Sequence, residues 1–244
     1  MTLILLVFFA SYNFDRIIFT PADFMRLPYP YLMGGRGGFN LTSSVTFMPG
    51  GIRGYEVSSR YRSFVLGAGY LDLGSLKETN EFGEIVGESR PGIFRGFLGT
   101  SITFDNYYFF FSFSHLRTFF RELNLREFWS SWYLSFPLPY DARLVLSLKM
   151  GTFFEPGIGV QSKFFKVFAS ARDRSDYSFT MLFNYLHKSF EGKIGFHFDN
   201  YFGSKSFKPV FALSVYPSKK FSLDYYYRYE PSLSDLVGIQ ISLR

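Results

Sequence analysis

The chain has 244 residues, and its 34 Phe, 18 Tyr and 2 Trp make aromatic residues 22% of the sequence, against 19% for charged residues. The absence of cysteine excludes disulfide frameworks, thiolate metal sites and cysteine nucleophiles. The sequence is too apolar for a disordered protein, yet no run reaches the roughly 18 to 20 apolar residues of a membrane-spanning helix. A globular β-rich protein or a membrane β-barrel remains, because aromatic side chains suit a pleated surface.

The formal net charge of +6 does not point to nucleic acid. Lysine and arginine are scattered among segments with the pattern of strands, and no basic run of the kind that marks nucleic-acid binding occurs. We therefore expect no nucleic-acid partner.

Residues 1–11 have the character of a secretory signal. The sequence MTLILLVFFAS is an apolar segment that ends in small residues, and it is too short to span a bilayer. It lacks a basic start, so a buried N-terminal strand is the alternative. A cleaved signal would place the mature chain beyond the inner membrane.

Residues 12–50 do not alternate and contain several prolines, so we expect loop or short-helix material. Irregular backbone can lie at membrane depth when protein encloses it. We predict that this segment plugs a barrel lumen through its glycine cluster, the alternative being a periplasmic extension. The cluster comprises Gly34, Gly35, Arg36, Gly37 and Gly38.

Residues 51–244 keep a period of two, with apolar and polar residues alternating along short runs. The segment 221–230 is an example, because Leu223 and Tyr225 share one face while Asp224 and Arg228 share the other. A soluble β-sandwich and a transmembrane barrel give the same local pattern. Three features favour the barrel: segments of roughly 9 to 12 residues, aromatic residues gathered near segment ends, and the export-like start.

We predict an all-β fold, a transmembrane antiparallel β-barrel of about twelve strands with an N-terminal luminal segment; fourteen strands is the near alternative. An even number is expected of bacterial single-chain barrels. A lumen of this size must be filled or must conduct. The candidate strands are 53–62, 63–73, 93–105, 106–116, 126–137, 140–152, 156–164, 165–173, 176–187, 190–200, 206–216, 219–230 and 234–244, with another possible at 41–48.

A glycine-rich phrase beginning at Gly67 resembles the PorV/PorQ family of outer-membrane barrels, which are related in fold to the FadL long-chain fatty-acid transporters. The resemblance covers roughly the first hundred residues and includes Met33-Gly34-Gly35 and Pro49-Gly50-Gly51. The residues that match the family's strand-and-loop phrase are Gly67, Gly69, Tyr70, Asp72, Gly74, Thr79, Gly83 and Gly87.

The resemblance implies a location in the bacterial outer membrane, with outer-membrane lipids as neighbours. It implies one of two functions: transport of hydrophobic small molecules, or a barrel without transport that serves as a structural or docking platform for a protein of a secretion machinery. The residues alone do not decide between a hydrophobic ligand and a secretion partner.

If the apolar faces point outward, the charged residues in phase with the polar faces line the lumen. Cross-strand ion pairing that stiffens the wall is one interpretation; a preference for anions, or binding of a carboxylate-bearing lipid, is the other. The predicted luminal wall comprises Arg143, Lys149, Lys166, Arg172, Glu191, Lys193, Asp224 and Arg228.

The acidic segment 72–88 could collect a hard cation, but it lacks the spacing of a known calcium loop, so we expect a solvated loop and no metal. The three histidines, His115, His187 and His197, form no recognisable catalytic or metal-binding motif. We therefore predict no enzymatic activity, no catalytic residue and no cofactor.

Overall fold

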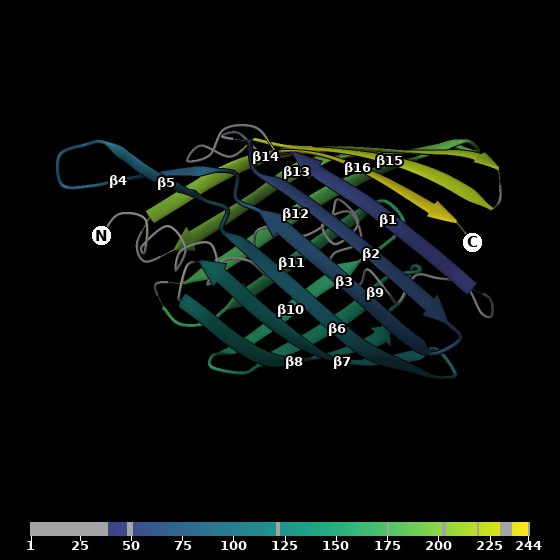
Figure 1. The fold of residues 1–244 in the computed structure, drawn as a ribbon. Coiled ribbons are helices and arrows are strands. Elements are labelled where there is room, and N and C mark those ends of the chain that lie inside the picture. The colour runs from purple at the N-terminus through teal and green to yellow at the C-terminus, as the bar shows by residue number, and fades with distance from the viewer. Residues whose placement is uncertain are drawn as a thin grey trace.

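Fourteen antiparallel strands close into a barrel in the computed structural model (Figure 1), and two further strands form a separate hairpin. The structure describes residues 39–47, 51–120, 123–174, 176–201, 204–218, 220–229 and 236–243. The strands are β1 (Phe39–Phe47), β2 (Arg53–Tyr61), β3 (Phe64–Asp72), β4 (Leu76–Thr79), β5 (Ile85–Ser89), β6 (Gly92–Phe104), β7 (Tyr107–Phe120), β8 (Leu123–Pro137), β9 (Arg143–Met150), β10 (Phe154–Gln161), β11 (Phe165–Ala171), β12 (Tyr177–Leu186), β13 (Phe190–Tyr201), β14 (Ser204–Ser218), β15 (Phe221–Arg228) and β16 (Leu236–Leu243).

The barrel has fourteen strands, the near alternative, and not the predicted twelve. All thirteen candidate segments correspond to barrel strands, and the further possible segment at 41–48 corresponds to β1, whose alternation is weak because Ser43 falls on its outward face. β1 closes the barrel by pairing with β16, from Leu41↔Leu243 to Phe47↔Val237. The barrel therefore starts at Phe39 rather than at residue 51. Residues 1–38, with the predicted signal and the glycine cluster 34–38, lie outside the described residues.

Each barrel strand pairs with its sequence neighbours, except that β3 pairs with β6 across the inserted hairpin. The meander needs only tight connections, because antiparallel neighbours can be joined by a few residues. Asp105 and Tyr140 adopt positive φ in two of these turns, a conformation that Asp tolerates better than most residues.

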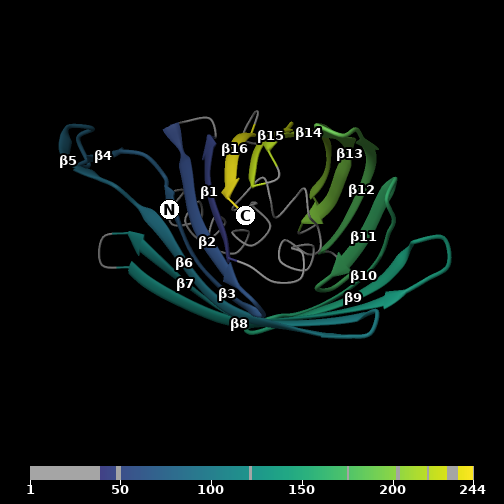
Figure 2. The ribbon, with the colours of Figure 1, turned by 90° about the vertical axis from the view of Figure 1, so that its right-hand side faces the viewer.

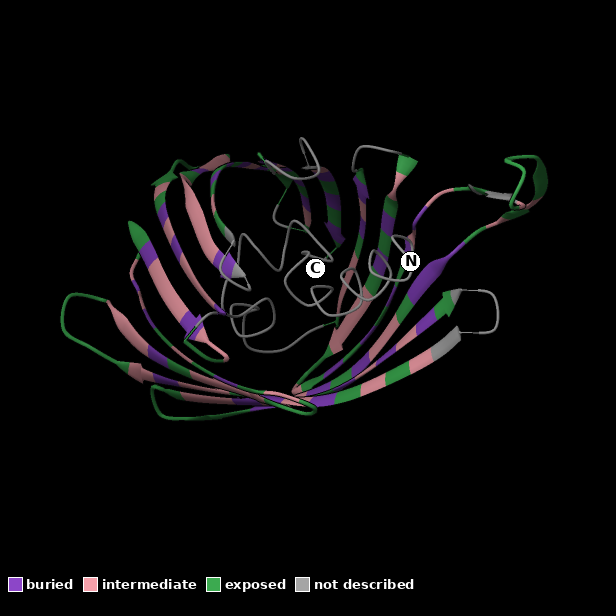
Figure 3. Cartoon of the chain, turned by 90° about the vertical axis from the view of Figure 1, so that its left-hand side faces the viewer, coloured by how far each residue is buried: buried purple, intermediate pink, exposed green. Residues whose placement is uncertain are grey.

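The two faces of the wall differ in chemistry, as the bands of buried and exposed residues in Figure 3 illustrate. On β3, Val65 is 1% exposed, whereas its neighbours Phe64 and Leu66 are 62% and 60% exposed. On most other strands the exposed face carries large apolar residues as well, among them Ile158, Phe183 and Ile194. A continuous apolar outer surface of this kind is what a barrel presents to lipid. Among the described residues, no helix is long and apolar enough to cross a membrane.

The two ends of the barrel carry different connections. At one end lie the short turns 62–63 and 105–106, together with the start of β1 and the end of β16. At the other end lies the longest connection, which contains the β4–β5 hairpin and stands away from the wall (Figures 1 and 2). Because outer-membrane barrels have short periplasmic turns and longer extracellular loops, we assign the hairpin end to the outside.

β7 and β8 are longer than the sequence indicates, as is β14. β7 continues to Phe120 and β8 begins at Leu123, whereas the alternating pattern predicts 106–116 and 126–137. The reason on β7 is that Arg117 falls on the outward face, where the pattern requires an apolar residue. Cross-strand pairing of β7 with β8 overrides this local signal.

Candidate functional site in the barrel interior

The inward residues follow from the period of two along each strand. On β15, Asp224 is 4% exposed and Arg228 is 2% exposed, while Leu223 and Tyr225 are about two-fifths exposed. The same phase holds on β16, where Gln240 is buried between the exposed Ile239 and Ile241. The polar face of these strands therefore points into the barrel, as the sequence pattern indicates.

Seven of the eight residues of the predicted luminal wall lie in the inward phase of their strands. The eighth, Arg172, directly follows β11 and continues the inward phase of that strand. They come from β9, β11, β13 and β15, so the wall occupies one side of the barrel. Their positions are Arg143 and Lys149 on β9, Lys166 on β11 and Arg172 just after it, Glu191 and Lys193 on β13, and Asp224 and Arg228 on β15.

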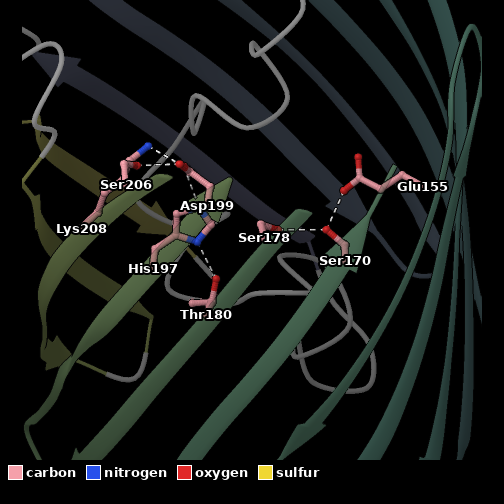
Figure 4. Close-up of polar contacts among 8 residues, drawn as sticks. All are labelled: Glu155, Ser170, Ser178, Thr180, His197, Asp199, Ser206 and Lys208. Carbon is pink, nitrogen blue, oxygen red and sulfur yellow. Dashed lines mark hydrogen bonds and ion pairs between the residues drawn. The ribbon is translucent and has the colours of Figure 1, made fainter. Parts of the chain in front are cut away.

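The first polar cluster joins β10 to β11 and β12 (Figure 4). Arg172 Nε donates to Glu155 Oε2 at 2.7 Å, and both side chains are almost fully buried, at 3% and 5% exposure. Ser170 Oγ donates to Glu155 Oε1 at 2.7 Å and lies 3.0 Å from Ser178 Oγ. The guanidinium of Arg172 also stacks 3.9 Å from the centroid of the Phe153 ring. These contacts satisfy both charges inside the wall.

Glu155 is a residue that the sequence pattern missed. The phrase Glu155-Pro156-Gly157 has the composition of a turn, but the structure places it inside β10. Pro156 is tolerated because pairing with β11 begins only at Gly157, so the proline lies beyond that ladder. Glu155 and Gln161 are an even number of positions apart, so they share the inward face of β10. This spacing was the signal that could have identified Glu155.

The second polar cluster spans β12, β13 and β14 (Figure 4). Asp199 binds Lys208 Nζ and Ser206 Oγ, each at 2.6 Å. His197 contacts both Asp199 and Thr180, a residue of β12. Its Nε2 is 3.5 Å from Asp199 Oδ2, and its Nδ1 is 2.7 Å from Thr180 Oγ1. The pairings His197↔Lys208 and Thr180↔His197 in the sheet bring these side chains together.

Thr180, His197 and Asp199 follow the order of hydroxyl, base and acid, but their geometry fits a structural role better. Asp199 is already held by a lysine and a serine at shorter distances than by the histidine. A catalytic acid orients its histidine through a close hydrogen bond. The other two histidines lie elsewhere: His115 points outward and stacks on Phe128 at 4.5 Å, and His187 lies in a turn beside Phe190.

Four further contacts, in two groups, continue the polar wall. Lys193 Nζ lies 3.1 Å from Glu191 Oε1, and Tyr216 donates to Glu191 Oε2 at 3.0 Å. On the neighbouring strands, Gln240 donates to Asp224 at 3.3 Å and to Ser242 at 3.0 Å. Since these pairs link adjacent strands or the same strand, they support ion pairing and hydrogen bonding as stabilisers of the wall.

The interior also contains buried apolar clusters, which the sequence analysis did not anticipate. Ile93 and Leu116 are at most 1% exposed and belong to one buried cluster with Leu71 and Trp129, which also includes Leu182, Val210, Ala212 and Tyr226 on β12, β14 and β15. Val65, Phe97, Phe110 and Val145 form a second cluster. β3, β6, β7 and β8 therefore carry apolar residues on both faces, interspersed on the inner face with buried serines. The nearly continuous aromatic run 107–113 was the available signal, because a strand that is apolar on both faces loses its alternation.

Arg95 is a cation that lies among these apolar residues. The guanidinium of Arg95 is 5.2 Å from the centroid of the Phe97 ring and 5.8 Å from that of Trp129. Contacts of this kind stabilise a cation over an aromatic face. Arg143, at the turn end, likewise lies over Tyr108 at 4.6 Å and donates to Ser135 Oγ at 2.7 Å.

The glycine-rich phrase has a packing explanation. Gly67 faces inward, where a Cβ would overlap the ring of Phe97, and Tyr70 faces outward over Gly92. Asp72 accepts a hydrogen bond from the main chain of Gly74, whose φ of 80° favours glycine. Of the remaining positions, Gly69 lies inward on β3, Gly83 turns the hairpin with φ of 81°, and Thr79 and Gly87 lie in its two strands. These residues are not brought together with the luminal charges.

The acidic segment 72–88 forms most of the β4–β5 hairpin. Asn80 organises its tip, accepting from the main chain of Phe82 and Glu84 and donating to the Glu84 carboxylate at 2.8 Å. Within the described part of the chain, no group of three or more acidic or histidine side chains could hold a metal ion.

The closed antiparallel barrel, with its apolar outer surface and polar inner wall, is an outer-membrane β-barrel protein of the bacterial type. No known protein-family profile matches the sequence, and no curated protein matches it. Solved structures share the fold.

The barrel is similar to the Ralstonia pickettii toluene transporter TbuX, with a TM-score of 0.61 and 12% identity over 92% of this chain and 93% of that one. It is similar to the CymD monoaromatic hydrocarbon channel, with a TM-score of 0.56 and 12% identity over 92% of each chain. It also resembles the Acinetobacter baumannii outer membrane protein Omp33, with a TM-score of 0.52 and 6% identity over 84% and 97% of the two chains. These likenesses place the chain in the bacterial outer membrane.

Proposed function

We propose that the protein passes hydrophobic small molecules across the outer membrane, as a barrel of the PorV/PorQ and FadL type. The observation that carries this proposal is the buried apolar cluster in the interior, which includes Leu116 and Trp129 and extends to residues of β12, β14 and β15. A water-filled pore for polar solutes has a polar lining, so inward apolar side chains fit an apolar solute better. The two hydrocarbon-transporting barrels of similar fold support this choice.

The mixture of apolar and charged residues in the interior suggests how such a molecule is handled. The apolar cluster offers contact area to a hydrocarbon skeleton, at roughly 25 cal/mol per Å² removed from water. Buried ion pairs such as Glu155 with Arg172 hold the wall rigid. A ligand can then contact the apolar residues while the barrel keeps its shape.

Replacing large side chains of the apolar cluster by smaller ones should selectively lower the uptake of apolar solutes. We expect the double variant Leu116→Ser and Trp129→Ala to reduce toluene entry into proteoliposomes by about tenfold, since roughly 1.4 kcal/mol of lost contact corresponds to a factor of ten. Entry of a sugar of similar size should stay the same. The measurement is fluorescence of a toluene-sensitive dye trapped in the vesicles.

Lys193→Met is the matched control, because it removes a luminal charge and none of the side chains that form the apolar cluster. Toluene entry equal in the wild type and the double variant, with both barrels folded, would contradict the proposal.

A second candidate function, the docking platform, is favoured by the β4–β5 hairpin. Phe82 is 80% exposed, and Ile85 and Val86 are each more than 60% exposed, on a hairpin that stands beyond the wall. Exposed apolar side chains at a loop tip are typical of contact with another protein. Failure of the toluene experiment, combined with crosslinking of a membrane partner at Phe82, would favour this function.

We further propose that the N-terminal segment acts as a plug. Because β1 begins at Phe39, a deletion that tests the plug must end at residue 38; one that reached residue 50 would remove the closing strand. Deletion of residues 12–38 should raise the single-channel conductance in planar bilayers at least severalfold over the full chain. Unchanged conductance of a correctly folded deletion variant would reject the plug.

A further inference from the structure

Four connections at the end of the barrel opposite the hairpin each carry a cation. They are Arg62 between β2 and β3, Lys163 between β10 and β11, Lys188 between β12 and β13, and Lys220 directly before β15. In the order of strands around the barrel, these connections follow one another from β10 through β16 and β1 to β3. The four residues therefore line one continuous part of the rim, which we call the basic arc.

The remaining part of the same rim is acidic. Asp105 lies in the turn between β6 and β7, and Asp141 lies in the turn between β8 and β9. These two turns are neighbours around the barrel, so the acids are grouped apart from the cations and do not alternate with them. All four side chains of the basic arc are exposed, and within the described part of the chain no ion pair joins any of them to a carboxylate.

Exposed aromatic residues border the basic arc on the lipid-facing surface. Tyr61 and Phe64, which flank the β2–β3 turn and pair with each other, are 57% and 62% exposed. The guanidinium of Arg62 lies 5.3 Å from the centroid of the Tyr61 ring, and Lys163 Nζ lies 5.8 Å from that of the Phe164 ring. Aromatic residues mark the boundary between hydrocarbon and headgroups, and cations beside them extend into the headgroup layer. The basic arc therefore lies at the height of the lipid phosphates.

Cations at the hairpin end are placed differently. Arg53 on β2 pairs in the sheet with Asp72 on β3, and Arg90 lies 3.8 Å from Glu88. Opposite charges in such positions compensate each other within the protein. The grouping of cations without acids is thus a feature of the basic arc and not of exposed cations in general.

We propose that the basic arc binds the headgroups of anionic phospholipids in the adjacent leaflet, which is the periplasmic one because we assigned the hairpin end to the outside. Ammonium and guanidinium groups donate charge-assisted hydrogen bonds to phosphate oxygens. A cluster of about four basic residues at a membrane surface is enough to attract anionic lipids. A lipid fits better than an acidic protein, because the cations lie beside lipid-facing aromatic rings in short connections. This site is independent of what passes through the lumen.

Retention of lipids by the full chain tests the basic arc. The barrel is placed in nanodiscs of equal parts phosphatidylglycerol and phosphatidylcholine with the same acyl chains, and the lipids that stay bound after extraction into detergent are counted by native mass spectrometry. We expect the wild type to retain phosphatidylglycerol at least fivefold over phosphatidylcholine, which carries no net charge. The quadruple variant Arg62→Gln, Lys163→Gln, Lys188→Gln and Lys220→Gln should retain the two lipids about equally. It should still fold, because all four side chains are exposed.

The matched control removes four exposed cations at the hairpin end and so has the same net charge as the quadruple variant. Its substitutions are Arg53→Gln, Lys77→Gln, Arg90→Gln and Lys205→Gln, and its lipid preference should stay within twofold of the wild type. A preference that survives in the quadruple variant, or that the control loses to the same extent, would overturn the proposal. Equal retention of the two lipids by the wild type would also overturn it and would favour an acidic protein as the partner of the basic arc. The migration of unheated protein on gels confirms that each variant is folded.

Discussion

Replacing Gly195 by alanine is expected to lower the free energy of unfolding of the barrel by about 3 kcal/mol, the upper part of the range for overpacking. A Cβ at this position would overlap the main-chain oxygen of Met181 and lie 2.9 Å from Cα of Leu182. Both atoms belong to the backbone of β12, so no side-chain rotation can relieve the contact. β12 and β13 must separate locally, which weakens their hydrogen-bonded ladder.

Gly192→Ala on the same strand is the matched control, since its Cβ would meet no atom within 4 Å. Urea unfolding in lipid vesicles, followed by tryptophan fluorescence, measures both variants. If the two substitutions destabilise the protein equally, the close approach of β12 and β13 at Gly195 is wrong.

Replacing Arg172 by methionine is expected to destabilise the barrel by about 3 kcal/mol, because removal of one partner from a buried ion pair is strongly destabilising. Glu155 then keeps its hydrogen bond from Ser170, and its side chain is only 5% exposed. Methionine retains most of the apolar contact that the arginine stem makes, so the loss reports the charge. The same urea titration measures the change.

A double-mutant cycle separates the pair from the packing. Adding Glu155→Gln to Arg172→Met should restore more than half of the lost stability, because the remaining amide is neutral. Arg90→Met is the control for an exposed pair: Arg90 and Glu88 lie 3.8 Å apart with 77% and 55% exposure, and such pairs contribute about 0.5 kcal/mol. A loss in Arg172→Met no larger than in Arg90→Met would contradict the buried pair.

The faces of the strands could be predicted because they depend only on local geometry. Successive side chains of a strand point to opposite sides, so Leu223 and Asp224 had to separate whatever the partner strands were. The strand count was harder. β1 contains Thr42, Ser43 and Ser44, and such residues give no clear apolar face. Its place is decided by pairing with β16, a contact between the two ends of the barrel.

The candidate site was predictable to the same extent. The eight wall residues could be grouped by phase, but their partners could not, because register between strands decides which charges meet. Glu155 escaped detection beside a proline, and Thr180 and Ser206 became visible only as partners of His197 and Asp199. The inward apolar residues of β3, β6, β7 and β8 escaped because alternation is weak where both faces carry apolar residues.

The sequence by itself determined the class of protein. Its period of two, its aromatic excess and its near-zero mean hydropathy of +0.04 follow from an apolar outside and a polar inside, which are fixed residue by residue. Only the tertiary structure decided the fourteen-strand closure, the apolar clusters inside the barrel, and the partners of the luminal charges. Each of these depends on register between distant strands, and register is a property of the closed sheet rather than of any one segment.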